Sequence, residues 1–249
     1  MTAQKLVKAR PKVVLEPINL HNADEFQELL RQRVLCGWNK EPADLEKWRA
    51  MSDLGQKSMF WIHLPAGTDT DTDTETDADA DAEEGPRRIG HISFQSVPDV
   101  GGPDSDPELA RPDKTVLMIS TFFLLHAYRL GGVGTAAMRQ LEAMTQVAPY
   151  GSPKCHTLTL HTISNQHVDV DDDGSPDGWL SSRGVWEKFG MPGRPKGSGL
   201  ESWYVRMGYT KWKEERRYHE QLPDGTKFQL IAAFLRKDVS RAKSSPSEI

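Results

Sequence analysis

The stretch VLMISTFFLLHAYRLGGVGTAAMRQLEAM, from Val116 to Met144, decides the fold. Its first part, Val116 to Leu125, is an apolar run rich in β-branched and aromatic residues, which is typical of a buried strand. We expect this strand to continue through residues 126–128 into the sequence RLGGVGT, which begins at Arg129. The following AAMRQLEAM has high helix propensity and apolar residues at helical spacing. The stretch therefore predicts a strand, a glycine-rich turn and a helix.

The predicted turn has the chemistry of an anion site. Glycines adopt backbone conformations that are closed to other residues, and they let a ligand come close. The first N–H groups of the following helix lack acceptors within the helix, and the positive end of its dipole lies there. Such a site suits a phosphate or pyrophosphate, and Arg129 adds a fixed positive charge. The alternative is a tight turn whose glycines only allow close packing.

Two familiar phosphate loops do not match. A P-loop ends in Gly-Lys-Ser/Thr, and no lysine lies between Lys114 and Lys154. A dinucleotide fingerprint has glycines spaced as GxGxxG, whereas here they are Gly131, Gly132 and Gly134. Neither nucleotide motif is therefore indicated.

The pattern R/Q-x-x-G-x-G/A does match, through Arg129, Gly132 and Gly134. In this the chain resembles the GNAT acyltransferases, in which the motif binds acetyl-CoA. The resemblance implies that backbone groups of the central strand bind the thioester and that the turn binds the pyrophosphate. The implied cofactor-binding residues are Phe122, Phe123, Leu124, Arg129, Leu130, Gly131, Gly132, Val133, Gly134 and Thr135.

A second motif strengthens the resemblance. Many GNAT enzymes carry Y-x-x-x-G-F after the fifth strand, and here Tyr204, Gly208 and Tyr209 match it, with tyrosine replacing the final phenylalanine. The resemblance implies that Tyr204 protonates the departing thiolate. The alternative is a tyrosine that packs its ring and hydrogen-bonds locally.

The general base is harder to assign. Some relatives place a glutamate on the central strand, but no carboxylate lies between Lys114 and Glu142. On the next expected strand, His161 takes the place of an equivalent glutamate, and histidine titrates in the right range to accept a proton. A packed or surface histidine is the alternative. Asn165 matches an asparagine that supports the cofactor in the family, so it joins the implied binding residues.

The succession of elements predicts an α/β fold, the GNAT fold, with a mixed, mostly antiparallel sheet of about seven strands flanked by about four helices. We expect one domain over residues 12–237, with a flexible arm at 1–11 and a flexible tail at 238–249. The expected strands cover residues 13–16, 57–64, 88–97, 116–128, 155–163, 209–218 and 228–235, with helices near 22–34, 42–53, 136–144 and 200–207.

Two insertions interrupt this plan. The acidic loop at 67–86 has nothing apolar to bury, so we expect it to be disordered, with metal binding by its aspartates as the less favoured alternative. Without the nine acidic charges between Asp69 and Glu84, the formal net charge of −5 becomes +4, which suits an anionic ligand. The insertion at 166–199 carries tryptophans and a phenylalanine, and we expect it to form a lid on the acceptor side.

Composition narrows the class of protein. The two cysteines lie far apart in sequence, so neither a disulfide framework nor a thiolate metal site is indicated, and we expect no metal. The N-terminus lacks a signal-peptide core and no apolar run reaches transmembrane length, which predicts a cytoplasmic or nuclear protein without a membrane partner. The sequence has no basic run with interleaved aromatic residues, so a nucleic-acid partner is not expected. We expect a monomer or homodimer.

Together these features predict an acetyl-CoA-dependent N-acetyltransferase that acts on a primary amine of a small molecule or protein. Acetyl-CoA is the co-substrate and the amine is the acceptor. Direct attack requires no covalent nucleophile, so Cys36 and Cys155 are interpreted as structural. The alternative is a non-catalytic GNAT-like module that binds or senses acyl-CoA, which the missing strand carboxylate allows.

Overall fold

The structure is a computed structural model that describes residues 11–65, 87–98, 106–129, 131–167, 199–221 and 227–240. The acidic loop, most of the 166–199 insertion and Leu130 lie outside the described residues. The predictions made for them stay predictions.

The described elements follow the predicted order. They are β1 (Val14–Pro17), α1 (Ala23–Cys36), α2 (Pro42–Asp53), β2 (Lys57–Leu64), β3 (Arg87–Gln95), β4 (Val116–Leu124), η1 (His126–Tyr128), α3 (Val133–Met144), β5 (Thr157–Ile163), η2 (Asn165–His167), α5 (Leu200–Arg206), β6 (Thr210–Gln221) and β7 (Lys227–Asp238). The seven strands form one sheet in the order β1-β2-β3-β4-β5-β7-β6. Strands β4 and β5 are parallel, whereas β1–β2, β2–β3, β5–β7 and β6–β7 are antiparallel. The predicted mixed, mostly antiparallel sheet of about seven strands is confirmed.

The end of β4 differs from the prediction. The strand stops at Leu124, and residues 126–128 form the short 3₁₀ helix η1 instead of continuing the strand. The backbone N–H of Leu125 still donates to the Ile89 carbonyl at 2.9 Å, but the Tyr128 N–H then donates back to the Leu125 carbonyl. Local turn bonds therefore replace sheet bonds as the chain approaches the glycines.

The chain divides into two compact units. Unit 1 comprises Met1–Ser96 and Ile119–Lys154, and unit 2 comprises Val97–Met118 and Cys155–Ile249. Strand β4 contributes to both, and its register with β5 begins at Val116 in unit 2. We describe each unit by itself.

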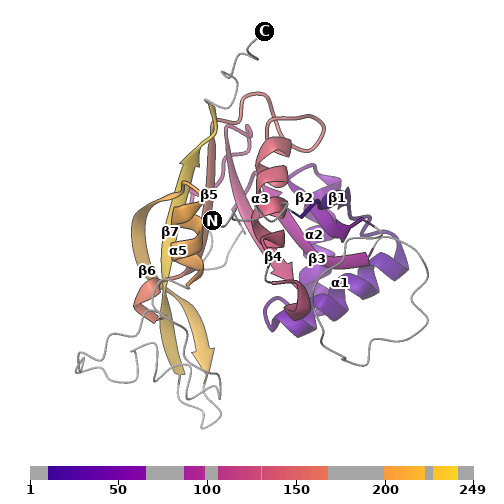
Figure 1. Cartoon of the computed structure of the whole chain (residues 1–249), viewed down its shortest axis with the longest axis horizontal. Coiled ribbons are helices and arrows are strands. Elements are labelled where there is room, and N and C mark those ends of the chain that lie inside the picture. The colour runs from indigo at the N-terminus through magenta and orange to yellow at the C-terminus, as the bar shows by residue number, and fades with distance from the viewer. Residues whose placement is uncertain are drawn as a thin grey trace, which may run out of the picture. The chain divides into compact units, whose positions relative to one another are not determined.

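In unit 1, α1 and α2 have strong end signals. The Asn22 side chain caps α1 by accepting from the backbone N–H groups of Asp24 and Glu25, and Gly37 ends that helix in the left-handed conformation. Helix α2 starts with Pro42, as predicted. Helix α2 packs against β2, and α3 packs against β1 and β3 (Figure 1). The largest fully buried side chains in this unit include Leu29, Leu45, Phe60, Trp61, Ile62, Phe94 and Ile92.

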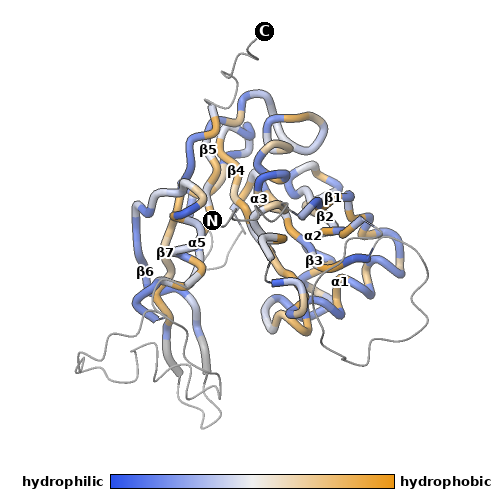
Figure 2. The backbone as a smooth tube through the Cα atoms, in the orientation of Figure 1, coloured by the Kyte–Doolittle hydropathy of each residue, from blue (hydrophilic) through white to orange (hydrophobic). Residues whose placement is uncertain are grey.

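In unit 2, β5, β7 and β6 lie side by side, and α5 packs against β5 and β7 (Figure 1). Its core joins Leu109, Met118 and Phe234, with Trp212 and Tyr218 packed against them. Figure 2 shows the edge strand β6 as hydrophilic and its neighbour β7 as more hydrophobic. This contrast is expected when one strand is central and the other lies at the edge.

Candidate functional site

The backbone of β4 is distorted near its end. Thr121 has a φ of 45°, which is an unusual value for a β-branched residue and indicates strain. Its hydroxyl is hydrogen-bonded to the Ser93 hydroxyl on β3. A Cβ at Gly90 on β3 would lie 2.2 Å from the Phe123 carbonyl oxygen, so only glycine permits this close approach. The distortion lies just before residues 122–124, for which the resemblance implies contact with the thioester.

Arg129 is fixed against the end of the same strand. Its Nε donates to the Leu124 carbonyl at 3.0 Å, and its guanidinium lies 5.6 Å from the centre of the Phe123 ring. Phe123 and Leu124 are buried, whereas Phe122 is half-buried and Arg129 is exposed. The exposed cation is thereby held next to the glycine turn.

The glycine turn takes the conformation that the motif requires. Gly131 and Gly132 have φ values of 79° and 86°, in the left-handed region. A Cβ at Gly131 would meet nothing within 4 Å, and one at Gly132 would meet Pro11 at an ordinary 3.7 Å. Backbone conformation, rather than lack of space, therefore requires glycine here.

Helix α3 starts at this turn with its first amides directed out of the helix. Gly132 is the N-cap and provides no side-chain cap, and the first bond within the helix runs from the Ala136 N–H to the Gly132 carbonyl. Val133 is buried and anchors the start, while Gly134 and Thr135 complete the first turn. The helix start and its dipole make this end of α3 favourable for an anion.

Unit 2 contains the predicted acid, Tyr204, on α5. Its ring is 7 % exposed and packs edge-on against the rings of Trp203 and Tyr209, at centroid distances of 4.7 and 5.8 Å. Burial raises the pKa of the Tyr204 hydroxyl above its ordinary value. The hydroxyl therefore keeps its proton at neutral pH and gives it up less readily than the hydroxyl of an exposed tyrosine.

The predicted base, His161, lies half-buried on β5. Its Nδ1 and the Tyr218 hydroxyl oxygen are 2.7 Å apart, and its ring packs against those of Tyr218 and Phe234. Sequence reasoning did not identify Tyr218, because it lies on β6, 57 residues away. The tautomer of His161 decides which of the two groups donates.

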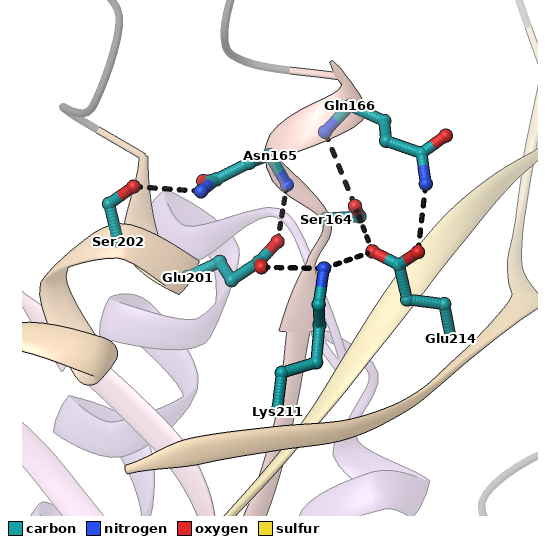
Figure 3. A network of polar contacts seen from close by, with 7 residues as sticks. All are labelled: Ser164, Asn165, Gln166, Glu201, Ser202, Lys211 and Glu214. Carbon is teal, nitrogen blue, oxygen red and sulfur yellow. Dashed lines mark hydrogen bonds and ion pairs between the residues drawn. The ribbon is translucent and has the colours of Figure 1, made fainter. Parts of the chain in front are cut away.

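Asn165 follows β5 and joins a polar network that sequence reasoning did not identify (Figure 3). Its backbone N–H donates to Glu201 at 2.6 Å and its side-chain amide donates to the Ser202 hydroxyl at 2.7 Å, which ties it to α5. The Asn165 side-chain oxygen is buried without a hydrogen-bond partner. The amine of Lys211 bridges Glu201 and Glu214 at 3.0 and 2.9 Å. We call Glu201, Lys211 and Glu214 the acid–lysine network.

The opposite charges of Lys211 and Glu214 shift each other's pKa. Burial alone would raise the pKa of Glu214, but hydrogen bonds from Lys211 and Ser164 outweigh it and lower that pKa. Burial would likewise lower the pKa of Lys211, but hydrogen bonds to Glu214 and Glu201 raise it. Opposite charges thus stabilise one another between α5 and β6, and within β6.

The described ranges contain neither a candidate metal site nor a candidate membrane span. No group of three or more His, Cys, Asp or Glu side chains there is placed to hold a metal ion. None of the helices in those ranges is long and apolar enough to cross a membrane.

Comparisons with known proteins concern the fold. No protein-family model and no curated protein sequence matches the chain. Among solved structures, NAA60 of Arabidopsis thaliana in complex with acetyl-CoA is 13 % identical, with 92 % of this chain and 99 % of that chain covered and a TM-score of 0.46. An aminoglycoside 6'-N-acetyltransferase complexed with coenzyme A is 12 % identical, with 90 % and 96 % covered and a TM-score of 0.48. RimL, a ribosomal L7/L12 alpha-N-protein acetyltransferase in complex with coenzyme A, is 8 % identical, with 92 % and 94 % covered and a TM-score of 0.48. The activity named for each neighbour is a property of that neighbour.

The structure thus groups the predicted residues in two sets. In unit 1 the end of β4, Arg129, the turn glycines and the start of α3 are contiguous, with Leu130 outside the described residues. In unit 2 Asn165 is bonded to α5, the helix that carries Tyr204, whereas the described side-chain hydrogen bond of His161 is to β6.

Proposed function

We propose that the chain is an acetyl-CoA-dependent N-acetyltransferase that transfers the acetyl group directly to a primary amine. The observation that carries this proposal is the glycine turn. It combines two left-handed glycines, an α3 start without a side-chain cap and an arginine fixed beside it. This combination suits the pyrophosphate of coenzyme A.

Within this proposal, the strand backbone and the two predicted catalytic side chains each have one role in the reaction. The backbone at residues 122–124, which follows the distortion at Thr121, hydrogen-bonds the thioester carbonyl and stabilises the oxyanion that forms when the neutral amine attacks. His161 accepts the proton that the amine loses, and Tyr204 donates a proton to the departing thiolate. The carbon–nitrogen bond forms when the amine attacks, and the carbon–sulfur bond breaks when the oxyanion collapses, so the products are an amide and free coenzyme A.

One observation favours the alternative, a module that binds acyl-CoA without turnover. Burial raises the pKa of Tyr204, which makes proton transfer from its hydroxyl to a thiolate less favourable. The two functions share the cofactor site and differ in whether Tyr204 acts in chemistry. A ligand test and a turnover test therefore separate them.

The ligand test measures melting temperature with acetyl-CoA, coenzyme A, NAD and ATP, because a ligand that binds only the folded state must raise it. We expect the first two to stabilise the protein more than NAD or ATP. Gly132→Ala should weaken stabilisation by acetyl-CoA. Gly55→Ala is the matched control, because Gly55 also has a positive φ, of 65°, with nothing within 4 Å of its Cβ position, and lies away from the turn. Equal loss in both variants, or no stabilisation of the wild type, would contradict the proposed cofactor site.

The turnover test follows thiol release from acetyl-CoA across a panel of primary amines. Tyr204→Phe should lower kcat by about 100-fold, the lower range for general-acid catalysis, while acetyl-CoA still stabilises the variant. Tyr209→Phe removes a hydroxyl from the same aromatic group and should change kcat little. Stabilisation by acetyl-CoA without turnover of any amine would favour the binding module.

A further inference from the structure

Three elements of unit 1 bring basic side chains to one buried place. Arg33 on α1 and Lys57 on β2 are each 3 % exposed, and His91 on β3 is fully buried. The guanidinium carbon of Arg33 and the amine of Lys57 lie 5.5 and 5.0 Å from the centre of the Trp48 ring. We call Arg33, Lys57 and His91 the cationic cluster. Buried cations are rare in proteins unless they are paired or functional.

The hydrogen bonds of Arg33 leave one donor unused. Its guanidinium donates to the Trp38 carbonyl and contacts Nε2 of His91 at 3.3 Å, but its buried Nε–H has no hydrogen-bond partner. Within the part of the chain that the structure describes, Arg33 forms no ion pair. Burial lowers its pKa, although the Cys36 thiol and the Asp44 carboxylate act in the opposite direction. A buried guanidinium with an unused donor is costly, and an anion would remove that cost.

His91 is neutral and adds no charge of its own. Its Nδ1 donates to the Gln32 side-chain oxygen at 2.9 Å, so Nε2 is the acceptor that faces Arg33. Burial first, and then the charges of Arg33 and Lys57, hold the pKa of His91 well below its ordinary range. A histidine so placed is a poor general base. The cluster is suited to holding an anion rather than to accepting a proton.

The cluster lies between an exposed loop and the strand end that the proposed function uses. Residues 37–41, between α1 and α2, are exposed, and Trp38 in this loop supplies the carbonyl that Arg33 binds. On the other side, the Lys57 amine donates to the Ser120 hydroxyl at 2.8 Å, and the His91 ring lies 5.5 Å from that of Phe123. The cluster is thus adjacent to the distorted end of β4.

We propose that the cationic cluster binds a carboxylate of the acceptor, so that the substrate is an amine that also carries a carboxylate. This inference rests on the proposed function. The carboxylate replaces the Trp38 carbonyl on Arg33 and also accepts from the unused Nε–H, which gives the paired geometry that guanidinium groups form with carboxylates. Exchange of a neutral acceptor for a charged one strengthens the hydrogen bonds. Specificity then comes from the guanidinium, which would remain poorly paired with an uncharged analogue.

The first test compares matched ligands on the wild-type protein with coenzyme A bound. The probes are glycine, leucine and lysine, each against its carboxamide, and inorganic phosphate as a different anion. We expect the free amino acids to raise the melting temperature and, with acetyl-CoA, to have KM values at least tenfold lower than those of the amides. Equal behaviour of acids and amides, no effect of either, or stabilisation by phosphate alone would overturn the inference. Stabilisation by the amino acids without stabilisation by coenzyme A would instead overturn the proposed function and leave the anion site in place.

The second test is a matched pair of variants in α1. Arg33→Met should remove the preference for the carboxylate by raising the KM of the acids at least tenfold, with the KM of the amides unchanged. Arg31→Met is the control, because Arg31 is on the same helix with its side chain 55 % exposed and paired with Glu28. Retention of the preference in Arg33→Met would overturn the inference. If that variant does not fold, the comparison of acids with amides on the wild type decides alone.

Discussion

The cationic cluster of unit 1 and the acid–lysine network of unit 2 are both groups of interacting polar side chains, but only the network contains charges of both signs. In the network, the amine of Lys211 lies between two carboxylates, one of which, Glu201, also accepts a backbone N–H. In the cluster, Arg33 and Lys57 are both positive, and the described partners of Arg33 are neutral. A group whose opposite charges are paired holds elements together, whereas a buried guanidinium with an unused donor, such as that of Arg33, is ready for a ligand. Stability measurements should therefore respond to the two groups in opposite ways.

The largest effect is expected in the network. Glu201→Ala removes the acceptor of the Asn165 N–H and one of the two carboxylates that pair with Lys211, which keeps Glu214, and should lower the free energy of unfolding by about 2–3 kcal/mol. Urea denaturation measures this change. Glu215→Ala is the control, because Glu215 is 41 % exposed and pairs with Lys213, and an exposed pair contributes less than about 1 kcal/mol. Equal costs for the two variants would show that the network does not hold α5 in place.

The next effect is a pH dependence in the cluster. The pKa of His91 is lower in the folded state than the ordinary value of 6.5. As the pH falls below 6.5, the unfolded chain therefore takes up a proton that the folded state does not bind, and the free energy of unfolding decreases. The loss has a maximum slope of about 1.4 kcal/mol per pH unit, the value for one proton. His91→Gln should remove this component from urea denaturation between pH 7 and pH 5.

Arg33 and Lys57 are the charges that lower this pKa together with burial. Arg33→Met should therefore raise the pKa of His91, which NMR titration of the imidazole measures directly. An unchanged pKa would mean that the charge of Arg33 does not act on His91, and the description of these two residues as electrostatically coupled would be wrong.

The sequence predicted most of the fold, but neither the cationic cluster nor the acid–lysine network. Helix α2 and strand β2 have the predicted limits, Pro42–Asp53 and Lys57–Leu64, because local signals mark both ends of each. The end of β4 was misplaced because the apolar run gives no sign of where the strand ends. In the structure, the bond from the Tyr128 N–H to the Leu125 carbonyl turns the chain there.

The two parts of the candidate site differ in the same way. The glycine turn was visible because its residues are contiguous and the left-handed conformation favours glycine. Arg33, Lys57 and His91 lie on three separate elements and are unremarkable in sequence, so only folding reveals their proximity. The positive φ of Thr121 had no sequence signal, because threonine does not favour that conformation.

A smaller effect, with the opposite sign to that of Glu201→Ala, is expected for Arg33→Met. Methionine retains much of the apolar volume and removes a buried, incompletely paired charge, so the free energy of unfolding should stay the same or rise by about 1 kcal/mol. The midpoint of urea denaturation measures this difference. Arg31→Met removes only an exposed pair with Glu28 and should change stability by less than about 0.5 kcal/mol. A loss of several kcal/mol in Arg33→Met would make the cluster a structural group like the network.

The smallest effect is the loss of stability that the acid–lysine network causes at low pH. Hydrogen bonds from Lys211 and Ser164 outweigh burial and hold the pKa of Glu214 below 4.5, so its contribution is complete above pH 4.5 and is lost as the pH falls through the folded value. Because the Glu214 side chain is 26 % exposed, solvent screening keeps this contribution below about 1 kcal/mol. Glu214→Gln should lower stability slightly at pH 7 and flatten the urea stability curve below pH 4.5, while the His91 component between pH 7 and pH 5 persists. The Glu214 component lies below pH 4.5 and the His91 component lies between pH 7 and pH 5. One pH series on Glu214→Gln and His91→Gln therefore separates the acid–lysine network from the cationic cluster. Loss of both components in Glu214→Gln would show that the two groups are coupled.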